Sequence, residues 1–262
     1  MRSVLTLITV CSLLPLATAQ SLAIPNQDGV LIDSEIILAH NKPSQKKQKS
    51  LDFSGTGRPG QQTAGESRGN CNSDSAFEAL LPVSKSGKTV SGQPSFWVYF
   101  PKALPQQSQV EFVIQNKARE DIWRSRGQLD ASAGYKKFAM PETAPPLEID
   151  QWYRWYVKVY CDSQNASAQY VQGWVSRIPI SSQLHVELLD YSRDSHLIYG
   201  NHSIWYDAIN HLLSNYHNDV PNLNLEQDWQ NLIGAKGVDL DQLPSIGGIY
   251  EAVKPMQPNS AY

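Results

Sequence analysis

The segment 152–161 constrains the fold more than any other part of the sequence. In a β-strand, alternate residues point to opposite sides, so the segment presents two chemically different rows. One row is mainly apolar and aromatic: Tyr153, Trp155, Val157, Val159 and Cys161. The other row alternates aromatic and basic residues: Trp152, Arg154, Tyr156, Lys158 and Tyr160. We expect the first row to face a core and the second to be amphipathic.

The amphipathic row has two interpretations. It is either a surface on which a ligand stacks, or a surface covered by C-terminal helices or a neighbouring loop. Aromatic rings and the alkyl stems of basic residues pack against protein more often than they bind ligands. The structural alternative to a binding surface is therefore that another part of the protein covers this row.

Short apolar segments separated by Pro, Gly and Ser continue on both sides of this strand. The other segments are 77–81, 96–100, 110–114, 121–124, 135–139 and 170–180. About seven short strands at such spacing predict an antiparallel β-sandwich of the immunoglobulin or fibronectin kind over residues 71–190. A parallel α/β fold is disfavoured because no helical crossover lies between the segments.

Residues 1–19 have the pattern of a secretory signal peptide. Arg2 precedes an apolar run from Val4 to Leu16, and small residues precede a cleavage site between Ala19 and Gln20. The run has 13 residues, fewer than the roughly 20 that span a bilayer. We expect an exported chain, periplasmic or extracellular, with no transmembrane segment after cleavage.

Export changes what the cysteines are expected to do. Cys11 leaves with the signal peptide, so Cys71 and Cys161 remain in an oxidising compartment and are predicted to form a disulfide. The alternatives are two unrelated buried thiols or a metal site, and two isolated cysteines supply too few ligands for the latter.

The rest of the chain divides by composition. Residues 20–70 are rich in Gln, Ser, Gly, Lys and Pro and predict a flexible leader. Residues 191–243 predict a C-terminal pair of helices packed on the sandwich, because 204–216 carry a helical apolar stripe and 229–233 a shorter one. Residues 244–262 predict a frayed tail.

Several motifs, taken in order, resemble a known family. They are Arg58-Pro59, 67–71 (SRGNC), 94–101 (PSFWVYFP), 112–115 (FVIQ), 153–161, 173–177 (GWVSR) and 204–208 (IWYDA). Together they are similar to the cyanobacterial family named domain of unknown function 928, over about residues 57–235. The resemblance implies an exported protein and supplies no activity, substrate or catalytic residue.

No catalytic, cofactor or metal site is predicted. Asp207 and His211 lie four residues apart on a predicted helix, which suits a base and its orienting partner, but a carboxylate near a helix N-terminus also has a structural role. The pattern 65–69 (GESRG) matches a nucleophile elbow around Ser67, yet it lacks the strand and helix that an elbow needs.

These observations favour a non-catalytic envelope protein that binds or scaffolds a protein or glycan partner. The formal net charge of −3 excludes nucleic-acid binding by bulk positive charge. One alternative is a cell-wall or carbohydrate hydrolase that uses acidic residues such as Asp207 or Glu187. Another is a structural partner in a secretion or surface assembly.

Overall fold

The computed structural model describes residues 50–55, 76–106, 108–128, 132–161, 168–190, 194–218 and 223–246. All of them belong to one compact unit, Lys49–Tyr262. The predicted signal peptide, Ser67, Cys71 and the end of the predicted tail, 247–262, lie outside the described residues.

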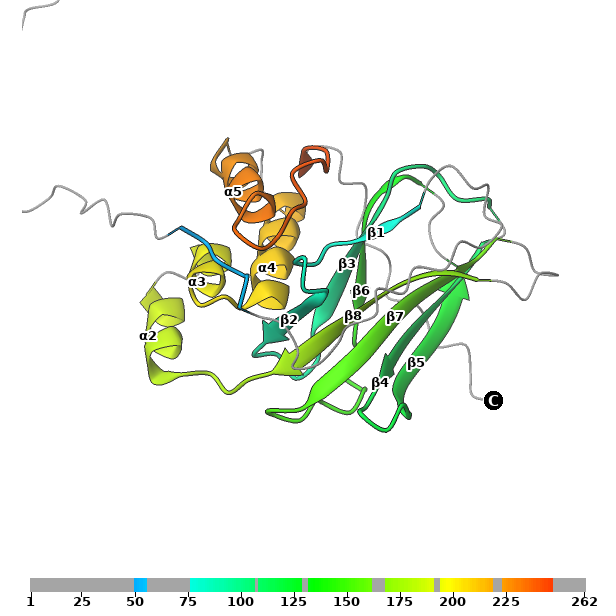
Figure 1. Cartoon of the computed structure of the whole chain (residues 1–262), viewed down its shortest axis with the longest axis horizontal. Helices are drawn as coiled ribbons and strands as arrows, with labels where there is room; N and C mark the ends of the chain where they lie inside the picture. Colours follow the sequence, from blue (N-terminus) through cyan, green and yellow to red (C-terminus); the bar gives the residue numbers. More distant parts are fainter. Residues whose placement is uncertain are drawn as a thin grey trace, which may run out of the picture. The chain divides into compact units, whose positions relative to one another are not determined.

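Two β-sheets and four helices make up the described part of this unit (Figure 1). The three-stranded sheet has the order β1 (Glu78–Ala79), β3 (Ser95–Phe100) and β6 (Gly134–Ala139). The five-stranded sheet has the order β2 (Ser86–Thr89), β8 (Gln169–Arg177), β7 (Trp152–Tyr160), β4 (Gln109–Gln115) and β5 (Asp121–Gln128). The helices are α2 (Ser182–Asp190), α3 (Ser195–Asn201), α4 (Trp205–Asn218) and α5 (Leu223–Ile233).

Each segment predicted as a strand coincides with a strand of the structure, but the five-stranded sheet is not wholly antiparallel. The additional strand, β2, has the sequence SGKT and pairs in parallel with β8. Its residues lack the apolar alternation that identifies a strand from sequence. The strand is instead held at the sheet edge by packing against α4.

The prediction of a C-terminal pair of helices is also wrong, because the described residues form four helices, the first beginning at Ser182. The helices α4 and α5 match the two predicted ones. In α2 the apolar residues do not form a buried stripe: only Leu184 is buried, while Val186 and Leu189 are exposed. The short α3 has too few residues for a periodic pattern to emerge.

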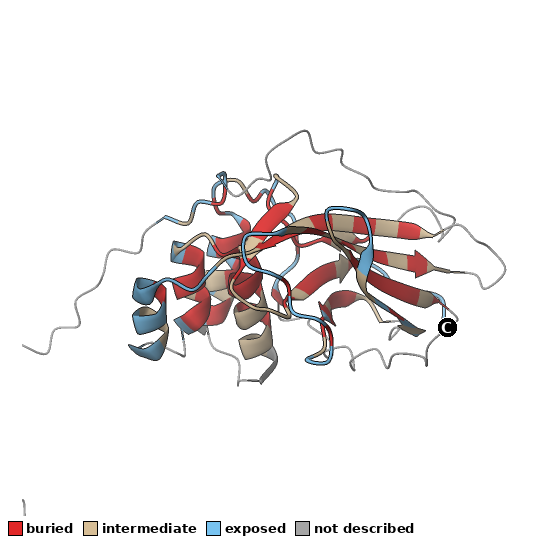
Figure 2. Ribbon diagram, turned by 90° about the horizontal axis from the view of Figure 1, so that it is seen from below, coloured by how far each residue is buried: buried red, intermediate tan, exposed pale blue. Residues whose placement is uncertain are grey.

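The core row predicted from the 152–161 segment is confirmed. Along β7 every second residue is buried, and this alternation of buried and intermediate residues is visible as red and tan bands on the strands (Figure 2). Trp155 is fully buried, and its ring centroid lies 5.0 Å from that of Phe96 on the other sheet. Phe96 also contacts Phe112, with the centroids 5.5 Å apart. The two sheets therefore pack face to face through aromatic side chains.

The first turn of α4 closes this core with the side chain of Tyr206. The indole Nε1 of Trp155 donates a hydrogen bond to the Tyr206 hydroxyl at 2.7 Å, and that hydroxyl donates to the Trp174 carbonyl at 2.8 Å. Burial raises the pKa of Tyr206 well above its ordinary value, so the hydroxyl stays protonated. One buried hydroxyl thus joins β7, β8 and α4.

Two glycines allow this close approach. A Cβ on Gly173 would lie 2.8 Å from the Trp155 indole nitrogen, and one on Gly87 would lie 2.9 Å from the Trp205 Cβ. Such distances are shorter than carbon and nitrogen atoms tolerate, so side chains at these two positions would push the helix and the tryptophan away.

The helices cover the outer side of the three-stranded sheet. Trp97 in β3 donates to the Asn210 side chain in α4 at 3.4 Å. Tyr135 in β6 packs edge-on against Trp229 in α5, with the centroids 5.3 Å apart, and its hydroxyl donates to the Pro244 carbonyl at 2.6 Å. The arrangement is therefore a helical layer, then the three-stranded sheet, then the five-stranded sheet.

Part of the predicted flexible leader belongs to this packed unit. Phe53 is fully buried, and its ring lies edge-on to that of Trp205 with centroids 5.0 Å apart. Its backbone N–H donates to the Lys236 carbonyl at 2.8 Å. Phe53 and the partly buried Leu51 anchor Ser50–Gly55, and the surrounding Ser, Gly and Lys composition concealed them.

Cys161, directly after β7, is disulfide-bonded. Its predicted partner Cys71 lies outside the described residues, so the pairing of these two cysteines stays a prediction.

Replacing Tyr206 by Phe tests the buried hydroxyl. The variant removes the hydroxyl that bonds to the Trp155 N–H and to the Trp174 carbonyl, so we expect it to lose about 1–3 kcal/mol of unfolding free energy in urea titrations. Tyr160→Phe is the matched control, because it keeps the ring that contacts Arg126, and it should change stability by less than about 0.5 kcal/mol. Equal losses in the two variants would contradict the role given to Tyr206.

A mutant cycle tests the predicted cysteine pairing. A cross-link between positions 90 residues apart stabilises by about 4–5 kcal/mol in the chain-entropy model. If Cys71 and Cys161 are paired, Cys71→Ser, Cys161→Ser and the double variant should lose the same amount of stability under oxidising conditions. Losses that add in the double variant would show that the two sulfurs act separately.

Candidate binding face

The outer side of the five-stranded sheet carries the amphipathic row predicted from β7. Its five residues, Trp152, Arg154, Tyr156, Lys158 and Tyr160, are all partly exposed. Strand pairing places neighbours from β4, β5 and β8 on the same side: Glu111, Val113, Gln115, Arg124, Arg126, Tyr170, Gln172 and Trp174. We call this combined set the outer face.

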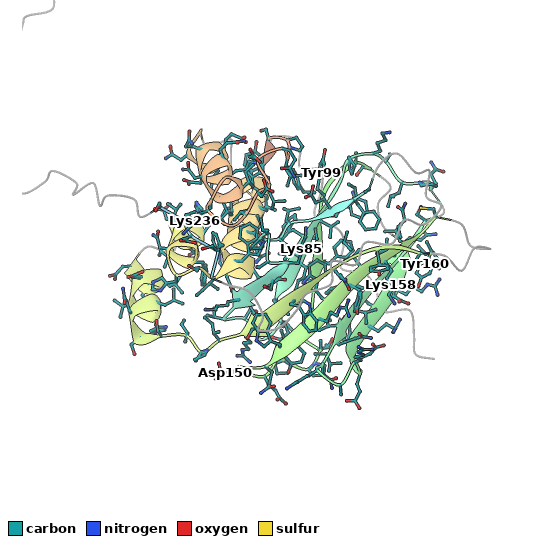
Figure 3. All side chains as sticks on the ribbon, in the orientation of Figure 1. Lys85, Tyr99, Asp150, Lys158, Tyr160 and Lys236 are labelled. Atoms are coloured by element: carbon teal, nitrogen blue, oxygen red, sulfur yellow. The ribbon has the colours of Figure 1, made fainter. Side chains whose placement is uncertain are left out.

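No described helix packs on the outer face. The helix α4 contacts the edge strand β2 of the five-stranded sheet and β3 of the other sheet, and α5 packs on β6 of the other sheet. In Figure 3, Lys158 and Tyr160 lie toward the end of β7 that is away from the helices. The described helices therefore do not cover this row, while cover by a neighbouring loop, the other form of the structural alternative, is not tested by the described residues.

Basic side chains lie over aromatic rings along this face. The Arg154 guanidinium is 4.9 Å from the Tyr156 ring centroid and 5.5 Å from that of Trp174. The Arg126 guanidinium is 4.8 Å from the Tyr160 ring centroid. Each such cation–π contact contributes roughly 0.5–1 kcal/mol at an exposed site. These contacts hold the long side chains in defined positions before any partner arrives.

Glu111 is the buried carboxylate of the outer face. One of its oxygens lies 2.6 Å from an Arg124 nitrogen and 2.9 Å from the Lys158 ammonium. Burial raises the pKa of Glu111, but hydrogen bonds and charge from Lys158 and Arg124 outweigh it and leave the pKa below its usual range. Glu111 therefore stays ionised and fixes two of the basic side chains.

Val113 and Tyr156 form the middle of the outer face. Val113 is fully buried although it lies outside the core between the sheets, since its cross-strand partners are Tyr156 and Arg124. Burial raises the pKa of Tyr156, so its hydroxyl stays neutral and able to donate a hydrogen bond. The middle of the face is a rigid layer of its own.

Sequence reasoning found the β7 row but missed the residues beside it. On β8, the alternate residues Tyr170, Gln172 and Trp174 repeat the aromatic and polar pattern of β7, so the signal was present. On β5, Arg124 and Arg126 also alternate. What the sequence lacked was the strand order, which places β4 and β8 on either side of β7.

The candidate acidic residues have separate structural partners. Asp207 is buried, and its carboxylate accepts a hydrogen bond from the Val90 N–H at 3.1 Å, which ties α4 to the end of β2. Glu187 pairs with His202 at 2.9 Å. The ring of His211 contacts the Tyr199 ring, with centroids 5.0 Å apart. Neither Asp207 nor Glu187 lies on the outer face.

A second histidine–carboxylate pair joins α3 to α5. His196 Nε2 lies 2.9 Å from an Asp228 carboxylate oxygen, and the histidine is almost fully buried. Among the described residues, no three His, Cys, Asp or Glu side chains are grouped so that they could hold a metal ion. In the same part of the chain, no helix is both long and apolar enough to cross a membrane.

Comparison with known proteins gives a family. A family model described as Domain of Unknown Function (DUF928) matches residues 63–245. The chain belongs to this family. The match agrees with the resemblance inferred from the ordered motifs, and it includes both sheets and all four helices. No curated protein matches this DUF928 chain.

Solved structures resemble parts of the DUF928 chain only distantly. CopC from Methylosinus trichosporium OB3b is 12% identical, covers 41% of this chain and 98% of its own, and has a TM-score of 0.29. The fn3 domain of the human collagen alpha-1(XX) chain is 11% identical, with coverage of 48% and 93% and a TM-score of 0.26. A Bifidobacterium dentium beta-glucuronidase is 8% identical, with coverage of 40% and 18% and a TM-score of 0.25. Similarities at this level carry no argument about function.

The buried Asp207 gives the DUF928 domain a testable pH dependence. Burial raises its pKa from 3.8 to about 6, and hydrogen bonds from Thr89 and Val90 offset this only in part. Because the folded state holds this proton more tightly than the unfolded state, the contribution of Asp207 to stability is greatest below pH 4 and declines as the pH rises to about 6.

The measurement compares the chain with Asp207→Asn by urea unfolding at several pH values. We expect the stability of the wild type, relative to the variant, to fall by up to about 3 kcal/mol between pH 4 and pH 6. The comparison isolates Asp207 from His211, whose pKa is lowered by burial and by the nearby His196 and Lys137. A constant difference across this range would show that Asp207 ionises normally.

Proposed function

We propose that this DUF928 protein is a non-catalytic binding module of the cell envelope and that its partner binds to the outer face. The observation that carries the proposal is the contrast between the two sheets. The helices α4 and α5 pack on the three-stranded sheet and α4 also on the edge strand β2, whereas no described helix packs on the aromatic and basic side chains of β7 and its neighbours.

The chemistry of the outer face suits binding. Aromatic rings supply contact area at a small entropic cost, and preordered basic and amide groups supply directional hydrogen bonds. A sheet is also a rigid support, so its side chains lose little freedom when a partner binds.

The proposal includes export of the chain and an immunoglobulin- or fibronectin-like arrangement of the two sheets. Support for export comes from the secretory pattern of residues 1–19 and the disulfide at Cys161. Support for the arrangement comes from two face-to-face sheets with an aromatic core. We further propose that the partner is a component of the envelope, which such a protein meets after export.

Removing aromatic rings from the outer face tests this proposal. We expect Tyr156→Ser/Tyr160→Ser to weaken co-sedimentation with purified cell-wall and envelope material by tenfold or more, because the stacking surface is lost. The matched control is Val186→Ser/Leu189→Ser, which removes exposed apolar side chains from α2 and should bind like the wild type.

Two results would contradict the proposal. One is equal binding by the aromatic variant, the control and the wild type. The other is release of soluble fragments from the same envelope material by the wild type and loss of that release in Asp207→Asn or Glu187→Gln. That second result would favour the hydrolase alternative.

A further inference from the structure

The basic residues of the outer face divide into two groups. Arg124 and Lys158 have a carboxylate partner in Glu111, and Arg124 also pairs with Asp121. Among the described residues, Arg126 and Arg154 instead contact aromatic rings and an amide. Arg126 lies over the Tyr160 ring, while Arg154 lies over two rings and donates to the Gln172 side-chain oxygen. These two guanidinium groups are therefore held in place by neutral neighbours, and no ion pair within the described part of the chain neutralises their charge.

A guanidinium that lies over an aromatic ring contacts the ring through its face. Its N–H groups point outward along the guanidinium edge, where they can bind an oxyanion. Arginine binds carboxylates through two parallel N–H···O bonds, and the planar fork loses little entropy when it does so. The outer face thus offers preplaced donors for negative groups.

The outer face is poor in exposed apolar side chains. The exposed large hydrophobic residues of the described chain lie elsewhere: Val83, Ile149, Ile180, Val186 and Leu189. On the outer face itself, Val113 is fully buried beneath its neighbours. Tyrosine, tryptophan and arginine also occur at the centres of protein interfaces, so these residue types alone do not identify the partner. A sugar chain is favoured here because sugar rings stack on tyrosine and tryptophan, and among the described residues no exposed large aliphatic side chain lies beside these rings.

The length of the outer face favours a polymer. From Trp152 to Tyr160 the row extends along β7 for roughly 27 Å at the usual rise of a β-strand. The two arginines lie at different positions along this row. Arg126 on β5 is level with Lys158, because both residues pair with Glu111 on β4. Arg154 lies four residues before Lys158 on β7, level with Trp174 on β8. A ligand that reaches both must carry more than one negative group along its length.

From these observations we infer that the outer face binds an extended acidic polysaccharide, one whose sugar units carry carboxylate groups. Arg126 and Arg154 bind the carboxylates, and the rings of Tyr156, Tyr160 and Trp174 contact the sugars. The inference rests on the proposed function and narrows its partner to one chemical class.

Polygalacturonate and its fully methyl-esterified form are the matched probes, because they differ only at the carboxyl groups, which are charged carboxylates in one and neutral methyl esters in the other. Using the purified full chain in a sedimentation or calorimetric assay, we expect the acid form to bind at least tenfold more tightly than the ester. Arg126→Gln/Arg154→Gln should lose that preference and bind the acid form no more tightly than it binds the ester. The control Lys102→Gln/Lys236→Gln removes the same charge from lysines that lie outside the outer face, and it should keep the preference.

The other outcomes distinguish failure of this inference from failure of the proposed function. Equal binding of acid and ester that depends on Tyr156 and Tyr160 would overturn the acidic-sugar assignment and leave the binding face intact. If both charge variants lose the preference to the same extent, the binding is general ion exchange, and the acidic-sugar assignment is overturned. Binding of no polymer, with a protein partner captured through the outer face, would overturn it as well. Binding of either polymer that ignores Tyr156 and Tyr160 would overturn the proposed function itself.

Discussion

The hydrogen bonds of the Tyr206 hydroxyl fix the register on which both sides of the five-stranded sheet depend. The hydroxyl accepts from Trp155 in β7 and donates to the carbonyl of Trp174 in β8, so a helix residue holds two neighbouring strands at one point. A shift of one residue in a strand would exchange its inner and outer rows. Because β7 lies between β4 and β8, such a shift would place charged residues in the core and remove the aromatic row from the surface.

The helical layer explains why the two sheets differ so much. By covering the outer side of the three-stranded sheet, α4 and α5 bury aromatic residues such as Trp97 and Tyr135 there. Similar residues on the outer side of the five-stranded sheet have no helix of the described chain above them, and cation–π contacts and the ion pairs of Glu111 stabilise them laterally. Equivalent aromatic chemistry thus forms a core on one sheet and a partly exposed surface on the other.

The sequence was sufficient for features that depend on local periodicity and insufficient for those that depend on distant neighbours. Alternation in β7 predicted both rows, and the apolar stripe in α4 predicted that helix. The parallel strand β2 carries only small and polar residues, so its place is fixed by α4 and β8. Phe53 was hidden in a polar segment, and its burial depends on Trp205. The wider outer face became visible only when the strand order placed Glu111 and Trp174 on either side of β7.

The distribution of charge separates the stabilising contacts of the outer face from those that suit a partner. Glu111 and Asp121 together supply two negative charges to Arg124 and Lys158, so these ion pairs are satisfied within the protein and leave little electrostatic attraction for a ligand. A guanidinium stacked on a ring is different, because the neutral ring positions the cation without cancelling its charge. Arg126 and Arg154 are held in this second way, at two points along a flat row of rings. Fixed but unneutralised charge at both points favours a partner with repeated negative groups over a single small anion.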